Sequence, residues 1–338
     1  MPSVVEPKAR AFVSAQQVAE RAGVSRSAVS RTFTAGASVS DATRRKVLRA
    51  AEELGYHVNH LARGLIHDES GIVSLLVAEM ATPFQSAMLA ALTRRLQAAD
   101  RVALVIDTSG GVDGVEAALR RSLNYRAGAS VVLSGAPSAS LVAACVNSGQ
   151  RVVLINRDDP IAGPAQVSVD NAAAAREALH MLDRCGCRRV ALVSSTAGTP
   201  SIVTREQAFT AAAAERGIAC TVVRAGPTGY AAGFDAGRSV LSGSVRPDAA
   251  FCVTDLLACG FMDAATRAFG LAIPDELCVI GFDDIEQAGW AAYDLTTFRQ
   301  PVDEMAGHIM ALLTAPEPDG TVRRFHATPV WRGSVRPR

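Results

Sequence analysis

The segment of residues 14–31 constrains the fold of this chain more than any other stretch. Ser14 and Gln17 have the spacing of a capping box, which satisfies backbone donors at the start of a helix. Gly23 lies where this first helix has to stop, because glycine adopts the left-handed conformation of a helix end without strain. Ser25 can cap a second helix directly afterwards. The spacing therefore predicts two short helices around a tight turn, which is a helix-turn-helix.

The predicted second helix, residues 26–33, carries basic and hydroxyl side chains on its outer face. Such groups bond base edges and phosphates when a helix lies in the major groove of DNA. The predicted DNA-contacting residues of this motif are Ser25, Arg26, Ser27, Ser30 and Arg31. A plain helical hairpin with solvated arginines is the alternative interpretation of the motif taken alone.

A third helix is predicted over residues 41–54, between a capping Ser40 and a terminating Gly55. Its inward-facing side chains are expected to be Val47, Leu48, Ala51 and Leu54. A short basic segment, residues 56–65, then leads to a much larger second unit. Three helices in this order weigh against the plain hairpin.

The net charge of +1 hides an asymmetry between the two parts of the chain. Residues 1–65 hold ten Lys and Arg against five Asp and Glu, a net charge of +5. The remaining residues hold 24 basic and 28 acidic side chains, a net charge of −4. A basic head on an acidic body indicates a nucleic-acid contact confined to one end of the chain.

Cysteine usage and hydropathy both favour a reducing environment. The seven cysteines show no paired spacing, and Cys185 and Cys187 are too close together for the usual zinc pattern. Residues 1–14 lack the apolar segment of a signal peptide, and no apolar run reaches membrane-spanning length. We therefore expect a cytoplasmic protein with no metal, no cofactor and no membrane partner.

From Gly71 onward, apolar strand-like runs alternate with longer amphipathic stretches. Strands that are apolar on both faces and separated by helices are typical of parallel sheets covered on both sides. The predicted strands are residues 72–77, 102–106, 130–133, 152–155, 167–169, 190–193, 249–253 and 277–281. The predicted helices are residues 84–98, 114–125, 141–148, 172–182, 205–216, 231–241, 256–269 and 302–313. This length is large for one doubly wound sheet, so two similar lobes are expected.

Open parallel sheets bind ligands beyond the carboxyl ends of their strands. The residues expected there are Thr82 to Gln85, Asp107, Asn156, Arg157, Ser194 to Thr199, Thr254, Asp255, Asp283 and Asp284. Carboxylates, an amide and an arginine beside one aromatic ring suit a polyol such as a sugar. Asp255 could instead cap the following helix, and one of Asp283 and Asp284 is expected to be structural. Thr228 and Tyr230 are further candidates for the same site.

The chain resembles the lactose-repressor (LacI) family of bacterial transcription regulators along nearly its whole length. The head matches at Val18-Ala19, Ala22 to Ser25, Val29 to Arg31, Val39-Ser40, Thr43-Arg44, Val47, Gly55-Tyr56 and Asn59 to Leu65. The large unit matches at Val169 to Asn171, Arg205, Phe209, Asp255, Pro274-Asp275, Gly281 to Asp284, Leu295 to Thr297, Gln300-Pro301 and Arg332 to Ser334. The departures are Val58, Ala208 and Thr254, where the family usually has proline, glycine and often asparagine.

The resemblance implies an all-α DNA-binding head and a periplasmic-binding-protein-like α/β core of two doubly wound parallel-sheet lobes. The head is expected over residues 1–58, a hinge helix or linker over 59–70, and an effector-binding and dimerisation core over 71–338. The first lobe would comprise residues 71–170 and 300–328, and the second would comprise 171–298 and 329–338. The chain would cross between the lobes near Asp170, near residues 298–300 and near Thr328.

The resemblance also implies how such a regulator works. The two heads of a homodimer would read the halves of a near-palindromic double-stranded operator. Asn59 and Leu65 are expected to contact DNA, with residues 59–65 helical on DNA and Leu65 wedged into the minor groove. Arg205 and Asp283 are the implied ligand contacts. With Phe84, Asn156 and Thr254, they make up the predicted effector site for a small hydroxylated molecule such as a sugar or sugar derivative.

Three classes of function compete for this sequence. A solute-binding protein would share the two-lobed core, but it would need an export signal and would not carry a basic three-helix head. A dinucleotide enzyme would need a Gly-x-Gly-x-x-Gly turn after its first strand, where this chain has Ala78 to Ala81. We therefore predict no enzyme, but a ligand-responsive, sequence-specific DNA-binding repressor of sugar or related small-molecule metabolism genes.

Overall fold

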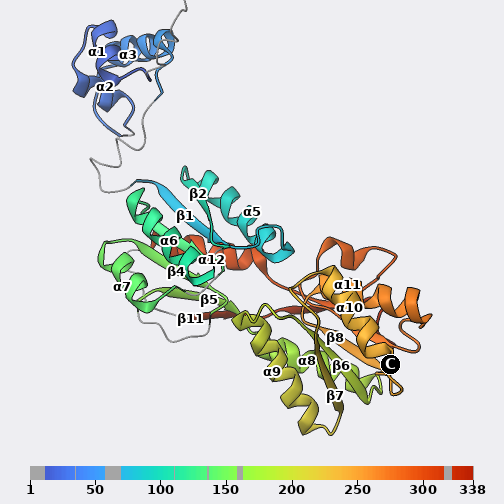
Figure 1. Cartoon of the computed structure of the whole chain (residues 1–338). Helices are drawn as coiled ribbons and strands as arrows, with labels where there is room; N and C mark the ends of the chain where they lie inside the picture. The colour runs from blue at the N-terminus through green and yellow to red at the C-terminus, as the bar shows by residue number, and fades with distance from the viewer. Residues whose placement is uncertain are drawn as a thin grey trace, which may run out of the picture. The chain divides into compact units, whose positions relative to one another are not determined.

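The computed structural model describes residues 12–34, 36–57, 70–109, 111–134, 137–157, 163–315 and 322–337. The chain divides into two compact units, Met1–Ser70 and Gly71–Arg338. The smaller unit is helical, and the larger one is built from parallel sheets with helices on both faces (Figure 1).

The smaller unit contains α1 (Ala15–Ala22), α2 (Arg26–Thr32) and α3 (Asp41–Leu54). The predicted capping box is present, since the backbone N–H of Ser14 donates to Gln17 Oε1 at 2.8 Å and the reverse bond also forms. Gly23 ends α1 with a φ of 65°, in the left-handed region that favours glycine. The Ser25 hydroxyl accepts from the backbone of Ala28 at 3.2 Å and starts α2. The sequence prediction of the helix-turn-helix is therefore confirmed.

The core of this unit is small. Its buried side chains are Val18, Ala19, Val29, Val47, Ala50 and Ala51, with Phe33 and Tyr56 packed against them. The prediction that Leu48 faces inward was wrong, because this side chain is 46% exposed. Leu48 follows Val47 by one position, which is about 100° around a helix, and the buried positions continue instead at Ala50 and Ala51.

The first sheet of the larger unit has six parallel strands in the order β11-β5-β4-β3-β1-β2. These strands are β1 (Ile72–Val77), β2 (Val102–Asp107), β3 (Ala129–Val132), β4 (Arg151–Ile155), β5 (Ala165–Val169) and β11 (Val322–Phe325). Helices α5 (Pro83–Ala98) and α12 (Val302–Thr314) contact one face, and α6 (Gly111–Asn124) and α7 (Ala139–Asn147) contact the other. Every residue of β1 is buried, which explains why its sequence is apolar without alternation.

The second sheet has four parallel strands in the order β7-β6-β8-β9. They are β6 (Arg189–Ser194), β7 (Ala219–Arg224), β8 (Ala249–Cys252) and β9 (Cys278–Ile280). Helices α8 (Asn171–Arg184) and α9 (Pro200–Glu215) cover one face, and α10 (Tyr230–Leu241) and α11 (Asp255–Asp263) cover the other. A π-helical turn, Ala264–Ala268, extends α11.

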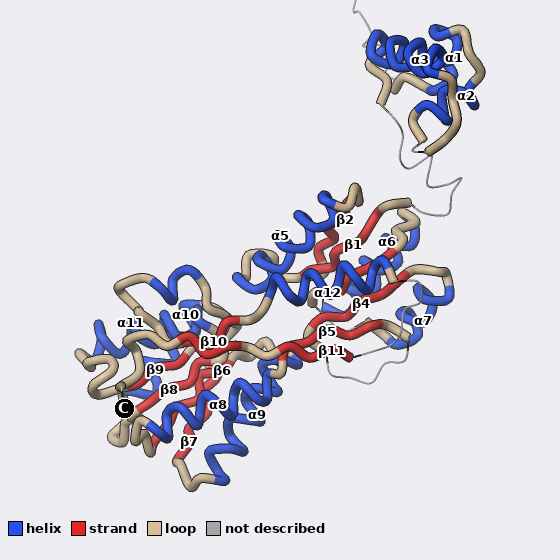
Figure 2. The backbone as a smooth tube through the Cα atoms, turned by 180° about the vertical axis from the view of Figure 1, so that it is seen from behind, coloured by secondary structure: helices blue, strands red, loops and turns tan. Residues whose placement is uncertain are grey.

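The chain passes between the two sheets after β5, at β10 (Thr297–Arg299) and at β12 (Thr328–Val330). The last two strands pair antiparallel with each other, Phe298 opposite Pro329. Between them, the chain returns to the first sheet through α12 and β11, which lies alongside β5 (Figure 2). We call β10 and β12 the crossing strands.

Four of these strands were not predicted from the sequence. Strand β7 lies at the edge of its sheet and has an irregular pattern of exposure, so it lacks the apolar run of its neighbours. Strands β10 and β12 are three residues long, and β11 has largely exposed side chains. Across the described residues, no helix combines the length and apolar character needed to cross a membrane.

Candidate functional site

A cavity of about 360 Å³ lies within the larger unit, lined by residues that follow strands of both sheets. From the first sheet come Glu79, Thr82, Pro83, Phe84, Gln85, Leu133, Ser134, Ile155, Asn156 and Arg157. From the second sheet and the crossing come Ala197, Thr199, Pro200, Ser201, Ile202, Arg205, Thr228, Thr254, Leu256, Asp283 and Gln300. The five residues predicted to bind effector, Phe84, Asn156, Arg205, Thr254 and Asp283, all line this one cavity.

Arg205 on α9 is held rigidly at the cavity wall. Its side chain is buried, and Nε donates to Asn171 Oδ1 at 2.8 Å while Nη1 donates to the carbonyl of Val253. The guanidinium lies over the ring of Phe282, with Cζ 3.6 Å from the ring centroid. Burial lowers the pKa of Arg205 to about 10, and the nearby carboxylates of Asp283 and Asp255 oppose that shift. The group is therefore a fixed cation at neutral pH.

Asp283 follows β9 with a φ of 126°, a strained conformation for a residue with a side chain. Its Oδ1 accepts from Gln300 Nε2 at 2.7 Å, and its backbone N–H donates to the carbonyl of Phe298 at 2.9 Å. Burial raises the pKa of its carboxyl to about 6, while Arg205 and the bond from Gln300 act in the opposite direction. At neutral pH, Asp283 thus offers carboxylate lone pairs beside a fixed cation.

The first sheet contributes the opposite wall. Phe84 stands in the first turn of α5, just after Thr82 and Pro83 begin that helix. Asn156 follows β4 with a φ of 54°, and its Oδ1 accepts from the backbone of Val169 at 3.4 Å. Phe84, Leu133 and Ile155 add apolar surface to a cavity that also has polar side chains.

Two glutamines line the cavity, of which Gln85 was among the residues expected after the first strand and Gln300 was not a sequence candidate. Gln300 is buried in the crossing between the lobes, and Gln85 lies beside Phe84 on α5. Within the part of the chain that the structure describes, Gln85 Oε1 and Gln300 Oε1 are buried and have no hydrogen-bond partner. Buried acceptors of this kind need a donor, which a water or a ligand inside the cavity can supply. Gln300 does not follow a strand of either large sheet, so the strand-end rule had no reason to select it.

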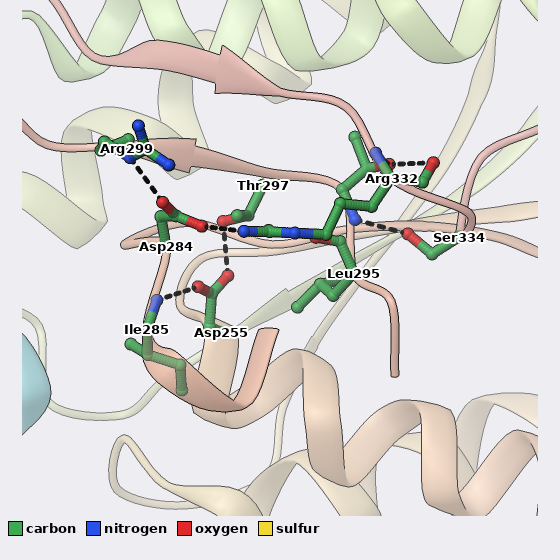
Figure 3. Close-up of polar contacts among 9 residues, drawn as sticks. Asp255, Asp284, Ile285, Leu295, Thr297, Arg299, Arg332 and Ser334 are labelled. Carbon is green, nitrogen blue, oxygen red and sulfur yellow. Dashed lines mark hydrogen bonds and ion pairs between the residues drawn. The ribbon is translucent and has the colours of Figure 1, made fainter. Parts of the chain in front are cut away.

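Other sequence candidates lie outside the cavity. Asp107 is bonded to the Ser109 hydroxyl, Tyr230 donates to Asp263 at 2.6 Å, and neither lines the cavity. Asp284 pairs with Arg299 and with Arg332, each at 2.6 Å (Figure 3). Although burial opposes them, these two arginines hold the pKa of Asp284 below its usual value. Of the two adjacent aspartates, Asp284 is thus the structural one.

The idea that Asp255 caps the following helix was wrong. The helix is capped by Thr254, whose hydroxyl accepts from the backbone of Leu257 at 3.5 Å. The Asp255 carboxylate is fully buried and accepts from Thr297 Oγ1 at 2.6 Å and from the backbone of Ile285 at 3.0 Å (Figure 3). Thr254 therefore has two uses, as a helix cap and as part of the cavity wall.

The predicted DNA-contacting residues of the helical unit are all exposed. Ser25, Arg26, Ser27, Ser30 and Arg31 lie at the start of α2 or along it. Arg44 on α3 donates to the carbonyl of Thr32 at 3.0 Å, which holds the end of α2 in place. Asn59 and Leu65, the two predicted contacts in the hinge segment, lie outside the described residues.

Comparison with known proteins agrees with this geometry. Bacterial regulatory proteins of the lacI family match residues 15–59, and a periplasmic-binding-protein-like domain matches residues 178–335. The HTH-type transcriptional regulator GalS of Salmonella typhimurium is 30% identical over 297 residues, which cover 87% of each chain. The chain belongs to the LacI family of bacterial regulatory proteins. The HTH-type transcriptional regulator CelR of Thermobifida fusca is likewise 30% identical over 327 residues, covering 88% of this chain and 90% of CelR.

The solved LacI-family structures confirm the predicted fold class. The lac repressor dimer bound to operator and the anti-inducer ONPF matches with a TM-score of 0.86 at 22% identity. That match covers 96% of this chain and 99% of the lac repressor chain. As a LacI-family member, the chain is a DNA-binding transcriptional regulator, and the relatives it matches are regulators and not enzymes.

Proposed function

We propose that this regulator is a cytoplasmic repressor. Its affinity for its operator is controlled by a small hydroxylated effector, such as a sugar or sugar derivative. The observation that carries the proposal is the convergence of Arg205, Asp283, Thr254, Asn156 and Phe84 on one cavity. A fixed cation beside a carboxylate bonds vicinal hydroxyls, and an aromatic ring covers the apolar face of a sugar. Among relatives of this chain, a CelR structure contains cellobiose and another relative is named a ribose operon repressor.

The proposed DNA contacts are on the helical unit and the hinge. Arg26, Ser27 and Arg31 occupy the exposed face of α2, where Arg side chains can bond guanine edges with two donors. Ser25 and Ser30 add exposed hydroxyls to this part of the helical unit, and hydroxyls bond phosphates or bases in DNA complexes. Residues 59–70 act as the hinge in this proposal, with Asn59 and Leu65 at the DNA and Leu65 as a minor-groove wedge.

Residues 71–338 are proposed to form the homodimer as well as the effector site. Strand β2 is the outermost strand of the six-stranded sheet, with Val102 58% exposed and Val105 42% exposed. An apolar edge strand is a liability for a monomer and suits pairing with a second copy. A homodimer also matches the symmetry of a near-palindromic operator, because each head reads one half-site.

The experiment that tests the proposed function compares the whole chain with a fragment starting at Gly71. A thermal-shift screen of mono- and disaccharides, including ribose and cellobiose, identifies the effector on both proteins. DNA selected from a random pool by the whole chain then serves as the operator. We expect both proteins to bind the same sugar and the whole chain alone to bind the operator, with an affinity that falls steeply with salt. Equal DNA affinity of the two proteins would contradict the proposal.

A further inference from the structure

The short segment of residues 281–285, which follows β9, touches both the effector cavity and the crossing strands. Asp283 lines the cavity and accepts from Gln300 at 2.7 Å. Its neighbour Asp284 forms ion pairs with Arg299 in β10 and with Arg332, two residues after β12. Asp284 thus contacts β10 and the residues just after β12 (Figure 3), and its neighbour in the sequence, Asp283, lines the cavity.

Asp255 contacts residues 281–285 at several points. Its backbone N–H donates to the carbonyl of Phe282 at 2.8 Å, and its Oδ2 accepts from the backbone of Ile285 at 3.0 Å. A Cβ at Gly281 would lie 2.1 Å from Asp255 Oδ1, so the segment passes too close for any side chain at that position. The backbone on both sides of Asp283 is thus held by one residue, by the backbone N–H of Asp255 at Phe282 and by its carboxylate at Ile285, although φ at Asp283 and at Asp284 is positive.

The same carboxylate also binds a crossing strand. Its Oδ1 accepts from the Thr297 hydroxyl at 2.6 Å, and Thr297 is a fully buried residue of β10. Next to it, the backbone N–H of Asp283 donates to the carbonyl of Phe298 at 2.9 Å. Each oxygen of Asp255 therefore holds a different partner, one in the segment and one in the crossing.

We propose that Asp255 is a positioning residue that couples the effector cavity to the crossing between the lobes. Asp255 bonds residues 281–285 with one carboxylate oxygen and β10 with the other. The two parts of the chain are therefore held together, and with them the position of Asp283. When ligand binding displaces Asp283, β10 therefore moves as well. In the same way, a movement of the crossing strands changes the position of the Asp283 carboxylate in the cavity. This inference rests on the proposed function of the cavity as the effector site.

If Asp255 couples the two parts, breaking its bond to Thr297 or its bond to Ile285 should loosen both β10 and residues 281–285. Thr297→Val removes the hydroxyl from β10 at nearly constant shape and leaves the sequence of residues 281–285 unchanged. Asp255→Asn keeps the shape but leaves a single acceptor oxygen for two donors. The matched control is Asp248→Asn, whose carboxylate accepts from the backbones of Arg188 and Arg189 at 3.0–3.1 Å in the same lobe.

The test is amide hydrogen exchange by mass spectrometry on the full-length protein, without ligand. In Thr297→Val and in Asp255→Asn, we expect exchange to rise about five- to tenfold in peptides covering both 281–286 and 296–299. Thr297→Ser, which keeps the hydroxyl, is expected to exchange like the wild type. Asp248→Asn is expected to leave both peptides unchanged.

Two results would overturn the inference. In one, each variant raises exchange only around its own site, which would make the two contacts independent anchors. In the other, exchange rises throughout the lobe in all variants and in the control alike. Asp255 would then only stabilise the lobe as a whole and would not couple the two parts. Since no ligand enters the measurement, a failed sugar screen counts against the proposed function and leaves this result standing.

Discussion

The charged side chains of the cavity are held in fixed positions by neighbouring residues. Arg205 is fixed by Asn171 and by the ring of Phe282, and Asp283 is held at a positive φ by the segment around it. Asp255 has no contact with the cavity, yet it determines where Asp283 lies. In the proposed function, the site therefore depends on buried carboxylates that do not all touch the ligand.

The titration of Asp255 gives a test of its burial. Burial and the neighbouring charge of Asp283 raise the pKa of the Asp255 carboxyl to about 7, above its ordinary value of 3.8. A carboxyl whose pKa is raised on folding stabilises the fold below pH 3.8, and this contribution is lost as the pH rises through 7. We expect the wild type to lose stability relative to Asp255→Asn between pH 4 and 7, and the difference to be flat above that range. Thermal unfolding of both proteins over this range measures it, and parallel curves would show that Asp255 is not buried as a carboxyl.

Gly281 gives a second residue-scale prediction. Because a Cβ there would lie 2.1 Å from the Asp255 carboxylate, Gly281→Ala should cost about 1–3 kcal/mol of folding free energy through overpacking. Gly128→Ala is the matched control, since its nearest heavy atom, the carbonyl oxygen of Ile72, is 4.0 Å away. Urea unfolding measures both, and equal midpoints for the two variants would refute the close approach.

Among the helices and strands, the side chains proposed to contact DNA lie on the capped helix α2, and those proposed to contact the effector follow the ends of strands. Helix α2 is held by Ser25 at its start, and Arg44 of α3 bonds the carbonyl of Thr32 at its end. Its exposed side chains are therefore presented on a backbone that is fixed at both ends, as base recognition requires.

For α2, we expect Arg26→Ala to weaken binding to the preferred operator by about 1–3 kcal/mol and to weaken binding to random DNA less. The control is Arg49→Ala, an exposed arginine on α3. Fluorescence anisotropy against both kinds of DNA measures the two losses. A loss of the same size on operator and on random DNA would reassign Arg26 to a phosphate contact.

The sequence predicted those parts of the fold and the site that depend on local patterns. Capping signals and the terminating Gly23 defined the helices of the head, and apolar runs placed the buried strands close to their observed bounds. The strand-end rule brought Phe84 and Asp283 to one cavity, because both follow parallel strands.

The contributions of Gln300 and Asp255 could not be predicted in the same way. Gln300 reaches the cavity from the crossing, and the place of a crossing depends on how two sheets are arranged in space. Asp255 stands at the start of a helix, where a carboxylate usually caps, yet its true partners are 30 and 42 residues away along the chain. Contacts of this range leave no periodic signal in a sequence.

At the scale of the whole molecule, the proposed dimer brings two heads to one operator. The exposed apolar side chains of β2 are its proposed contact. We expect Val105→Lys to shift the protein from dimer to monomer in light scattering and to weaken operator binding at least tenfold, because the two half-sites are then bound separately. Val245→Lys is the control, since this side chain is 72% exposed on the other lobe. A dimer of unchanged stability in Val105→Lys would place the interface elsewhere.

The proposed function requires that a ligand held by Asp283 controls DNA binding by the helical head. Operator titrations with and without the sugar found in the screen, on wild type, Asp283→Ala and the exposed-carboxylate control Asp107→Ala, test it most directly. We predict equal operator affinity for all three without sugar, and a sugar response in Asp283→Ala that needs about ten- to a hundredfold more ligand. If Asp283→Ala responds at the wild-type sugar concentration, or loses operator binding together with thermal stability, Asp283 only braces its loop and the account is wrong.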